Sequence, residues 1–271
     1  MKALIFDIDG TLWDSRELVA RGYNEHLCSI GRPDLQVDAQ RLKSLFGKTM
    51  SEIADILFES IEKPERYNVM QRCTDREEVI LHQDPCRIAF PGVEETLPKL
   101  KEHYRLFIVS NSQCGYPELL IEKLGIGHLI EGHLCFGDTG LPKGDTIRLL
   151  MERYGVDDAV YIGDTQGDLE ACEKAGIPFI FCGYGFGEPE RWDARIDAFS
   201  ELPRVLETMC QPAPSFIPVS SAWSPIKCAK RLGPLRPRFA RPPLPTGEAS
   251  DFFHKLPHGH PPWVSMRCFS W

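Results

Sequence analysis

The chain of 271 residues lacks any apolar run that approaches the roughly 18 residues of a membrane-spanning helix, which argues against an integral membrane protein. Its ten cysteines include no Cys-x-x-Cys pair, and several stand inside apolar runs, where cysteine packs as a small hydrophobic side chain. Near the N-terminus, acidic residues follow only four apolar residues, a pattern unlike a secretory signal. These absences predict reduced thiols and a cytoplasmic location.

Strand-like sequence is almost missing between residues 15 and 87. Apolar residues recur there at spacings of three and four, which predicts amphipathic helices, and Ser15 suits the start of the first one. Elsewhere in the first 210 residues, strand-like and helix-like segments alternate. This alternation predicts an α/β fold, a Rossmann-like parallel sheet with helices on both faces, and the helical stretch predicts an inserted all-helical unit.

The composition changes abruptly after residue 210. Residues 211–271 hold 12 of the 22 prolines, and eight Lys or Arg against two acids give them a charge of +6, which leaves −14 for residues 1–210 given the total of −8. Without sustained periodicity, this tail is expected to be largely disordered. Arg236–Arg238 and Arg241–Pro245 could form a polyproline ligand or contact nucleic acid, and His258 with His260 is a weak metal-binding pattern. Disorder without a specific partner is the favoured interpretation.

Two carboxylates stand two positions apart at the end of the first apolar run. Ala3–Phe6 predicts a buried strand, and Asp7-Ile8-Asp9-Gly10-Thr11-Leu12 follows it directly. The period of 2 along a strand sends the side chains of Asp7 and Asp9 to the same side, and parallel sheets bind ligands at the carboxyl ends of their strands. The pattern indicates a candidate phosphoryl-transfer site. An acidic turn that caps a strand would explain this motif equally well if it stood alone.

Three further polar motifs follow in order along the chain, and the first and last come directly after strand-like runs. The motifs are Ser110-Asn111, Gly140-Leu141-Pro142-Lys143-Gly144-Asp145 and Gly163-Asp164-Thr165-Gln166-Gly167-Asp168. Each has an ordinary structural explanation when taken singly: a turn, a solvated lysine and a helix cap. Their joint order favours a shared function.

The four motifs together resemble those of the haloacid dehalogenase superfamily, and specifically of its phosphatases with a helical cap, of which phosphoglycolate-phosphatase-like proteins are typical. The resemblance covers about residues 1–210. It implies an α/β core built from residues 1–14 and 88–210, interrupted by a helical cap of residues 15–87. Residues 211–271 lie outside it.

The resemblance also implies a role for each motif. Asp7 would be the nucleophile that forms an aspartyl-phosphate, and Asp9 would be the general acid and base. Ser110, helped by the backbone amide of Asn111, would bind a phosphate oxygen. Lys143 would neutralise charge on Asp7 and on the phosphoryl group.

Magnesium is the cofactor that the resemblance implies, and its preference for hard oxygen ligands agrees with the residues present. Asp7, Asp164 and the backbone carbonyl of Asp9 are the expected ligands. Asp168 is expected either to bind the metal or to support its ligands.

Substrate choice is expected to lie in the helical cap. Residues 45–51 look like the cap's substrate-facing loop, in which Gly47 would form the turn and Lys48 could meet an anionic leaving group. A solvated lysine explains Lys48 at least as well. Thr11 is a further expected substrate contact. The expected partner is a small phosphorylated metabolite, with no nucleic acid, no membrane and at most a weak protein contact through the tail.

These features predict a magnesium-dependent phosphatase that acts on a small phosphate monoester. A glycoside hydrolase would leave Lys143 and Ser110 unexplained, and by the resemblance a dehalogenase lacks an acid at the position of Asp9. A phosphomutase that uses the same Asp7 and Asp9 stays open, although Thr11 weakly favours the phosphatase. A non-catalytic phospho-accepting or scaffold protein that acts through the proline-rich tail also stays open, but it would not need Asp9.

Overall fold

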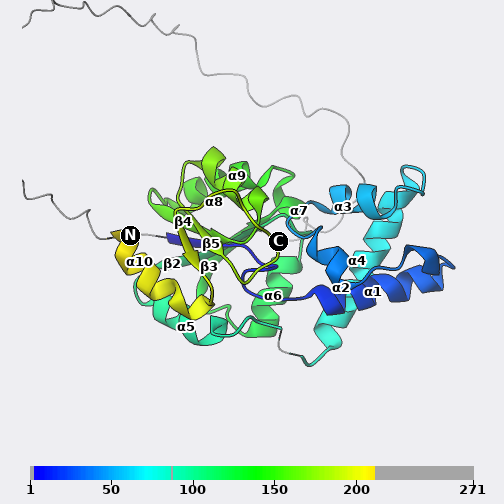
Figure 1. Ribbon diagram of the computed structural model, residues 1–271, viewed down its shortest axis with the longest axis horizontal. Helices are drawn as coiled ribbons and strands as arrows, with labels where there is room; N and C mark the ends of the chain where they lie inside the picture. Colours follow the sequence, from blue (N-terminus) through cyan, green and yellow to red (C-terminus); the bar gives the residue numbers. More distant parts are fainter. Residues whose placement is uncertain (1–2, 87, 211–271) are drawn as a thin grey trace, which may run out of the picture. The chain divides into compact units, whose positions relative to one another are not determined.

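The computed structural model describes residues 3–86 and 88–210, so the predictions for residues 211–271 lie outside the described residues. The described part, drawn in colour in Figure 1, contains one parallel sheet. Its strand order is β3-β2-β1-β4-β5-β6. Its strands are β1 (Ala3–Phe6), β2 (Arg105–Ser110), β3 (Ile130–Cys135), β4 (Ala159–Gly163), β5 (Phe179–Cys182) and β6 (Ala194–Ile196). The predicted parallel α/β fold is confirmed.

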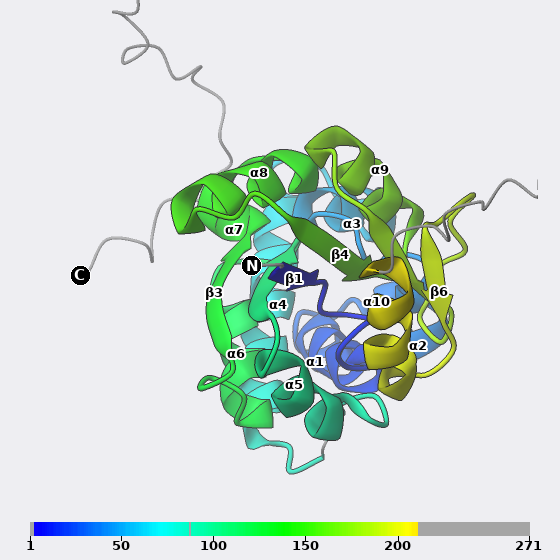
Figure 2. The ribbon, with the colours of Figure 1, turned by 90° about the vertical axis from the view of Figure 1, so that its left-hand side faces the viewer.

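Helices cover both faces of this sheet because the strand side chains alternate between two apolar clusters. Leu4 and Phe6 of β1 pack with α5 (Val93–Lys101), α6 (Tyr116–Leu124) and α10 (Leu202–Cys210). Ala3 and Ile5 pack on the other face, with α8 (Lys143–Tyr154) and α9 (Gln166–Ala175). Figure 2 shows α8 and α9 on one side of β1 and β4, and α5, α6 and α10 on the other. Strands buried on both faces explain their nearly continuous apolar sequences.

The helices predicted between residues 15 and 87 are present and have an apolar cluster of their own. They are α1 (Arg16–Ser29), α2 (Ala39–Lys43), α3 (Met50–Leu57) and α4 (Glu65–Gln83), with a 3₁₀ turn at Pro33–Leu35. The apolar cluster includes Tyr23 of α1, Ile53 of α3 and Cys73 of α4. Helix α1 lies so close to α4 that a Cβ at Gly22 would stand 2.7 Å from the Cα of Glu77. We call residues 16–83 the helical segment; in Figure 1 it lies beside one end of the sheet.

Two strands were not predicted, and both lie at an edge of the sheet. Strand β3 carries Glu131 and His133, and the three residues of β6 include Arg195. Both strands are partly exposed, so polar side chains replace the apolar run that marks a buried strand.

Two further sequence predictions concern the described residues directly. Within them, no helix combines the length and the apolar character that a bilayer crossing requires. Seven cysteines of the described part are free thiols, four of them buried.

Candidate active site

The four sequence motifs meet at the carboxyl ends of the central strands. Strand β1 pairs with β2 on one side and β4 on the other, with Phe6 level with Ile108 and Ile162. Asp7 directly follows β1, Ser110 is the last residue of β2, and Asp164 directly follows β4. Because neighbouring parallel strands end at one edge, side chains distant in sequence converge there.

Asp7, Asp164 and Asp168 form a buried acidic cluster around one lysine. Each of the three offers a carboxylate oxygen that lies within 4.8 Å of the others. The Nζ of Lys143 donates to Oδ1 of Asp7 at 2.9 Å and to Oδ1 of Asp168 at 2.7 Å. All four side chains are at most 5% exposed, so solvent screens their charges little.

The carboxylates of the cluster outnumber its positive charges. Oδ2 of Asp164 accepts a hydrogen bond from the backbone N–H of Phe186 at 2.7 Å, but its buried Oδ1 has no hydrogen-bond partner among the described residues. A buried carboxylate oxygen without a donor is costly, and one lysine does not balance three carboxylates. Hard oxygen ligands in this number suit Mg²⁺, so the residues present fit the metal that the sequence predicts.

The pKa values of the cluster reflect the same imbalance. Burial raises the pKa of Asp7 to about 7, against the opposing charge of Lys143. Burial, together with the charges of Asp168 and Asp7, raises the pKa of Asp164 well above its ordinary value. For Asp168, burial is outweighed by Lys143 and by hydrogen bonds, which hold its pKa below the usual range. Without a cation in addition to Lys143, therefore, the three carboxylates do not all ionise near neutral pH.

Asp168 is held by hydrogen bonds on both of its oxygens. Its Oδ1 accepts from Lys143, and its Oδ2 accepts from the backbone N–H of Asp164 and from the backbone N–H and Oγ1 of Thr165. The bond from the Thr165 backbone belongs to a capping box, whose second bond runs from the backbone N–H of Asp168 to Oγ1 of Thr165, the N-cap residue of α9. These contacts favour a role for Asp168 in orienting Lys143 and the loop of Asp164.

Gly10 lies against this cluster and cannot carry a side chain. Its φ is +84°, and a Cβ would stand 2.1 Å from Oδ2 of Asp164. We expect Gly10→Ala to lower the free energy of unfolding by about 1–3 kcal/mol. Thermal unfolding will measure the loss, with Gly140→Ala as the matched control, because Gly140 also has a positive φ (+63°) but open space around it. Equal losses in both variants would contradict the close approach to Asp164.

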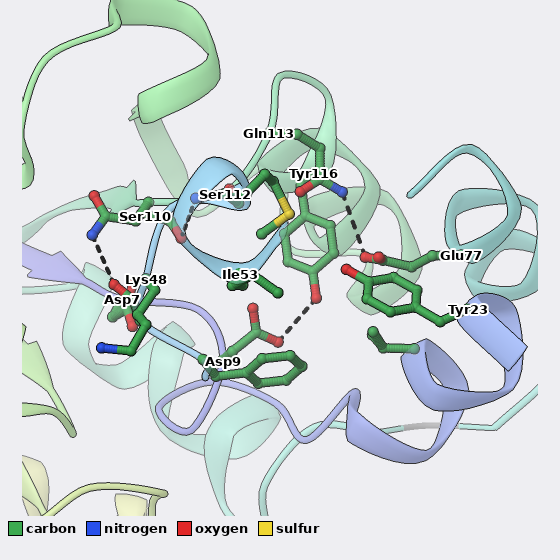
Figure 3. Close-up of a pocket in the computed structure, with 15 residues that line it drawn as sticks. Asp7, Asp9, Tyr23, Lys48, Ile53, Glu77, Ser110, Ser112, Gln113 and Tyr116 are labelled. Carbon is green, nitrogen blue, oxygen red and sulfur yellow. Dashed lines mark hydrogen bonds between the residues drawn. The ribbon is translucent and has the colours of Figure 1, made fainter. Parts of the chain in front are cut away.

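Asp9 is held through one oxygen by three donors. Its Oδ1 accepts from Nε1 of Trp13 at 2.9 Å and from Oγ of Ser15 at 2.6 Å. It also accepts from Oη of Tyr116 at 2.9 Å, the bond to Asp9 that Figure 3 shows. Burial raises the pKa of Asp9 to about 6, against the effect of these hydrogen bonds. Since Oδ1 is occupied as an acceptor, the proton of the acid form belongs on Oδ2. Ser15 begins α1 as predicted, but its hydroxyl binds Asp9 rather than the helix N-terminus.

A cavity lies between these strand ends and the helical segment. It is lined by Asp7, Asp9, Ser110 and Asn111 from the sheet side and by Gly47 and Lys48 from the helical segment (Figure 3). The structure thus brings together six of the residues selected from the sequence. Lys143, Asp164 and Asp168 lie behind Asp7 in the acidic cluster.

Contacts across the cavity join the helical segment to the sheet. Nδ2 of Asn111 donates to the backbone oxygen of Gly47 at 2.8 Å, so this side chain holds the loop, whereas its backbone amide was the predicted phosphate contact. Gly47 has a φ of +88°, and a Cβ there would stand 3.1 Å from Thr165. The ring of Phe46 lies 5.7 Å from that of Phe186.

Thr11 does not line this cavity. It is fully buried, and its backbone oxygen accepts a hydrogen bond from Oη of Tyr184 at 2.8 Å. A contact between Thr11 and a substrate stays a prediction.

Sequence reasoning missed several residues that line the cavity, including Tyr23, Glu77, Gln113 and Tyr116. Tyr116 is the first residue of α6 and lies outside the four motifs. Glu77 did leave a signal, because it stands at a core-facing position of α4, four residues after Cys73 and three before Ile80. A carboxyl in an apolar stripe marks a buried acid that needs an explanation.

Comparison with known proteins places this site in a family context. The family model of haloacid dehalogenase-like hydrolases matches residues 4–182. The chain is 26% identical to the N-acetylmuramic acid 6-phosphate phosphatase of Pseudomonas aeruginosa, over 76% of this chain and 93% of that protein. It is 27% identical to a phosphoglycolate phosphatase of Xanthomonas campestris pv. campestris, over 79% of this chain and 98% of that protein.

Solved structures share the fold at lower identity. One is a protein of Haemophilus somnus described as a predicted phosphoglycolate phosphatase, with a TM-score of 0.64 and 22% identity, covering 76% of this chain and 98% of that one. Another is the β-phosphoglucomutase of Clostridium difficile, with a TM-score of 0.63 and 17% identity, covering 76% of this chain and 95% of that one.

Proposed function

Because the chain belongs to the family of haloacid dehalogenase-like hydrolases, we propose that it is a magnesium-dependent phosphatase that hydrolyses a small phosphate monoester through an aspartyl-phosphate intermediate. The observation that carries the proposal is the arrangement around Asp7. Its carboxylate is bound by Lys143, faces the same cavity as Asp9 and shares the acidic cluster with Asp164. The phosphatase names of its relatives support the same reaction.

Asp7 is the proposed nucleophile. Lys143 holds its Oδ1, which leaves Oδ2 to attack phosphorus. The pKa of Lys143 lies above its ordinary value because Asp168 and Asp7 outweigh the effect of burial, so the lysine stays cationic. This fixed charge neutralises both the nucleophile and the oxygens of the transferring phosphoryl group.

Asp9 is the proposed acid of the first step and base of the second. The proton on its Oδ2 passes to the oxygen of the leaving alcohol, and the resulting carboxylate then takes a proton from the water that attacks the aspartyl-phosphate. Trp13, Ser15 and Tyr116 fix the other oxygen, so the side chain keeps one orientation through both steps.

The metal would be held by the carboxylates of Asp7 and Asp164 and by the backbone carbonyl of Asp9. When bound, Mg²⁺ supplies positive charge to the phosphate oxygens and orients them for in-line attack. Asp168 keeps Lys143 in place through its Oδ1. Ser110 lines the cavity beside Asp7 and would donate its hydroxyl to a phosphate oxygen.

Residues 15–87 are proposed to act as a cap, and residues 1–14 and 88–210 as the core. Two contacts support a closed arrangement over Asp7 and Asp9. They are the bond from Asn111 to the backbone of Gly47 and the contact of Phe46 with Phe186. Closure would exclude bulk water and select a small phosphorylated metabolite.

Release of inorganic phosphate from a panel of small phosphate esters, with and without Mg²⁺, tests this function. We expect turnover that requires the metal. A phosphomutase is the second candidate, favoured by the β-phosphoglucomutase among the structural neighbours. It would move the phosphoryl group between hydroxyls of a sugar phosphate and release little phosphate, which would contradict the phosphatase.

Removing the metal should make stability depend on pH. Asp7 has a pKa of about 7 in the folded chain against 3.8 as a free side chain, so the metal-free folded state binds more protons than the unfolded state between these values. We therefore expect the melting temperature in EDTA to fall as the pH rises from about 4 to 7. Bound Mg²⁺ favours the ionised forms of these acids, so it should remove much of this fall in melting temperature.

Asp164→Asn provides the control for the metal experiment. It removes an expected ligand with the unpartnered Oδ1, and should abolish the rise in melting temperature on addition of Mg²⁺. A magnesium shift of the same size in wild type and Asp164→Asn would contradict the proposed metal site.

A further inference from the structure

Glu77 is a buried carboxyl at the end of the cavity that faces away from Lys48. It comes from α4, is 3% exposed and lines the same cavity as Asp7 and Asp9. In Figure 3, Lys48 lies on the side of Asp7, whereas Glu77 and Tyr23 lie on the opposite side, beyond Asp9. We call the side of Asp7 and Lys48 the phosphate end of the cavity and the side of Glu77 and Tyr23 its acidic end.

The neighbours of Glu77 do not balance its charge. Nε2 of Gln113 donates to its Oε1 at the long distance of 3.5 Å, and the hydroxyl of Tyr23 forms a second hydrogen bond. Both groups are neutral, and burial together with the charge of Asp9 raises the pKa of Glu77 to about 8, so near neutral pH the protonated acid predominates unless a cationic ligand stabilises the carboxylate. A carboxylate has about four lone-pair sites, so two hydrogen bonds leave it able to accept more.

The two basic side chains to consider, Lys48 and Arg76, do not pair with Glu77. Among the described residues that line the cavity, Lys48 carries the single positive charge, and it stands at the other end. Arg76, which precedes Glu77 in α4, is exposed and pairs with Glu25 of α1. A buried carboxylate without a cationic partner is strongly unfavourable, so Glu77 ionises readily only when a ligand supplies one.

The walls between the two ends are mainly apolar or aromatic. Val19, Met50 and Ile53 line the cavity together with the rings of Tyr23 and Tyr116. Such walls suit a short carbon chain that ends in a polar group, and aromatic faces also attract a cation.

On the basis of the proposed phosphatase activity, we propose that Glu77 is a specificity-determining residue: it binds an ammonium or hydroxyl donor on the alcohol part of the substrate and rejects alcohols that end in a carboxylate. The alcohol of phosphoglycolate carries such a carboxylate, so this chain differs in substrate from relatives named for that ester. Lys48 then meets the phosphate group of the substrate instead of an anionic leaving group.

Three esters of nearly equal size test the proposal through the wild-type protein alone. Phosphoethanolamine, ethylene glycol monophosphate and 2-phosphoglycolate end in an ammonium, a hydroxyl and a carboxylate, respectively. We expect kcat/KM to fall in that order, with the carboxylate ester at least about tenfold below the ammonium ester, because an ammonium stabilises the carboxylate of Glu77 whereas a second carboxylate places negative charge beside it.

Glu77→Gln keeps the shape of the side chain and removes its charge. We expect the ratio of kcat/KM for phosphoethanolamine over 2-phosphoglycolate to fall about tenfold or more. Turnover of p-nitrophenyl phosphate, whose leaving group carries neither charge nor donor at that end, should change much less. Glu78→Gln is the matched control, since it removes the same charge from the next, exposed residue of α4 and should leave the ratio unchanged.

The outcomes separate the two proposals. A wild-type preference for 2-phosphoglycolate, or an unchanged ratio in a folded Glu77→Gln variant, would overturn the role of Glu77 while the phosphatase activity stands. No turnover of any of the four esters with Mg²⁺ would instead contradict the phosphatase. If Glu77→Gln does not fold, as judged by circular dichroism, the wild-type ranking decides.

Discussion

Asp7→Asn should lower phosphate release by a factor on the order of 10³ or more, for every ester that the wild type hydrolyses. An amide is nearly isosteric with a carboxylate but is not a nucleophile, so the covalent step is lost while the packing of the cavity is kept. The variant also removes one of the two negative partners of Lys143, whose Nζ lies 2.9 Å from Oδ1 of Asp7. Initial rates of phosphate release at saturating Mg²⁺ will measure the effect.

The same change at an exposed aspartate controls for general damage. Asp34 pairs with Arg32 at the surface, and its side chain is 60% exposed. Asp34→Asn should therefore leave turnover near the wild-type level. If Asp7→Asn keeps a tenth or more of the wild-type rate while remaining folded, Asp7 is not the nucleophile.

Asp9→Asn should separate the two chemical steps. We expect it to lower the steady-state rate for alkyl phosphates by about 10²–10⁴-fold, because the leaving alkoxide then lacks its acid and the attacking water lacks its base. With p-nitrophenyl phosphate, whose leaving group needs no proton, the first step should survive. The variant should then release a burst of about one equivalent of nitrophenolate and stall as the aspartyl-phosphate.

Rapid-mixing measurements of nitrophenolate will detect this burst, and the double variant Asp7→Asn with Asp9→Asn is the control that should show none. A slow linear release without a burst would contradict the proposed role of Asp9 in the second step.

The wild type offers a pH test of the first step. Burial raises the pKa of Asp9 to about 6, so its acid form is lost as the pH rises past that value, and the first step should slow for alkyl esters but not for the aryl ester.

Sequence reasoning succeeded where strong local signals exist. The buried central strands are short apolar runs that end in polar motifs, and the helical segment shows regular apolar spacing, so their existence and order could be predicted. The convergence of Asp7, Ser110 and Asp164 followed from the geometry of parallel strands. The two edge strands escaped prediction because exposure removes the apolar pattern.

The missed cavity residues have a different cause. Tyr116 reaches Asp9 from a helix that begins 107 residues later in the chain, and Glu77 reaches the cavity from the buried face of α4. Neither belongs to a short motif, so their positions depend on how α4 and α6 pack, which no local pattern encodes. Ser15 shows the same limit, since its place at a helix start was visible but its bond to Asp9 was not.

The order of strands in the sheet has a consequence for how the chain is made. Strand β1 is synthesised first, yet it lies in the middle of the sheet, between β2 and β4. Lys143, which neutralises Asp7, emerges from the ribosome 136 residues after it, and Asp164 emerges later still. A nascent chain that ends before Lys143 lacks β4, leaves one edge of β1 unpaired and carries Asp7 without its lysine, a state prone to wrong pairing. The proposed active site is therefore completed late in synthesis, when β4 pairs with β1.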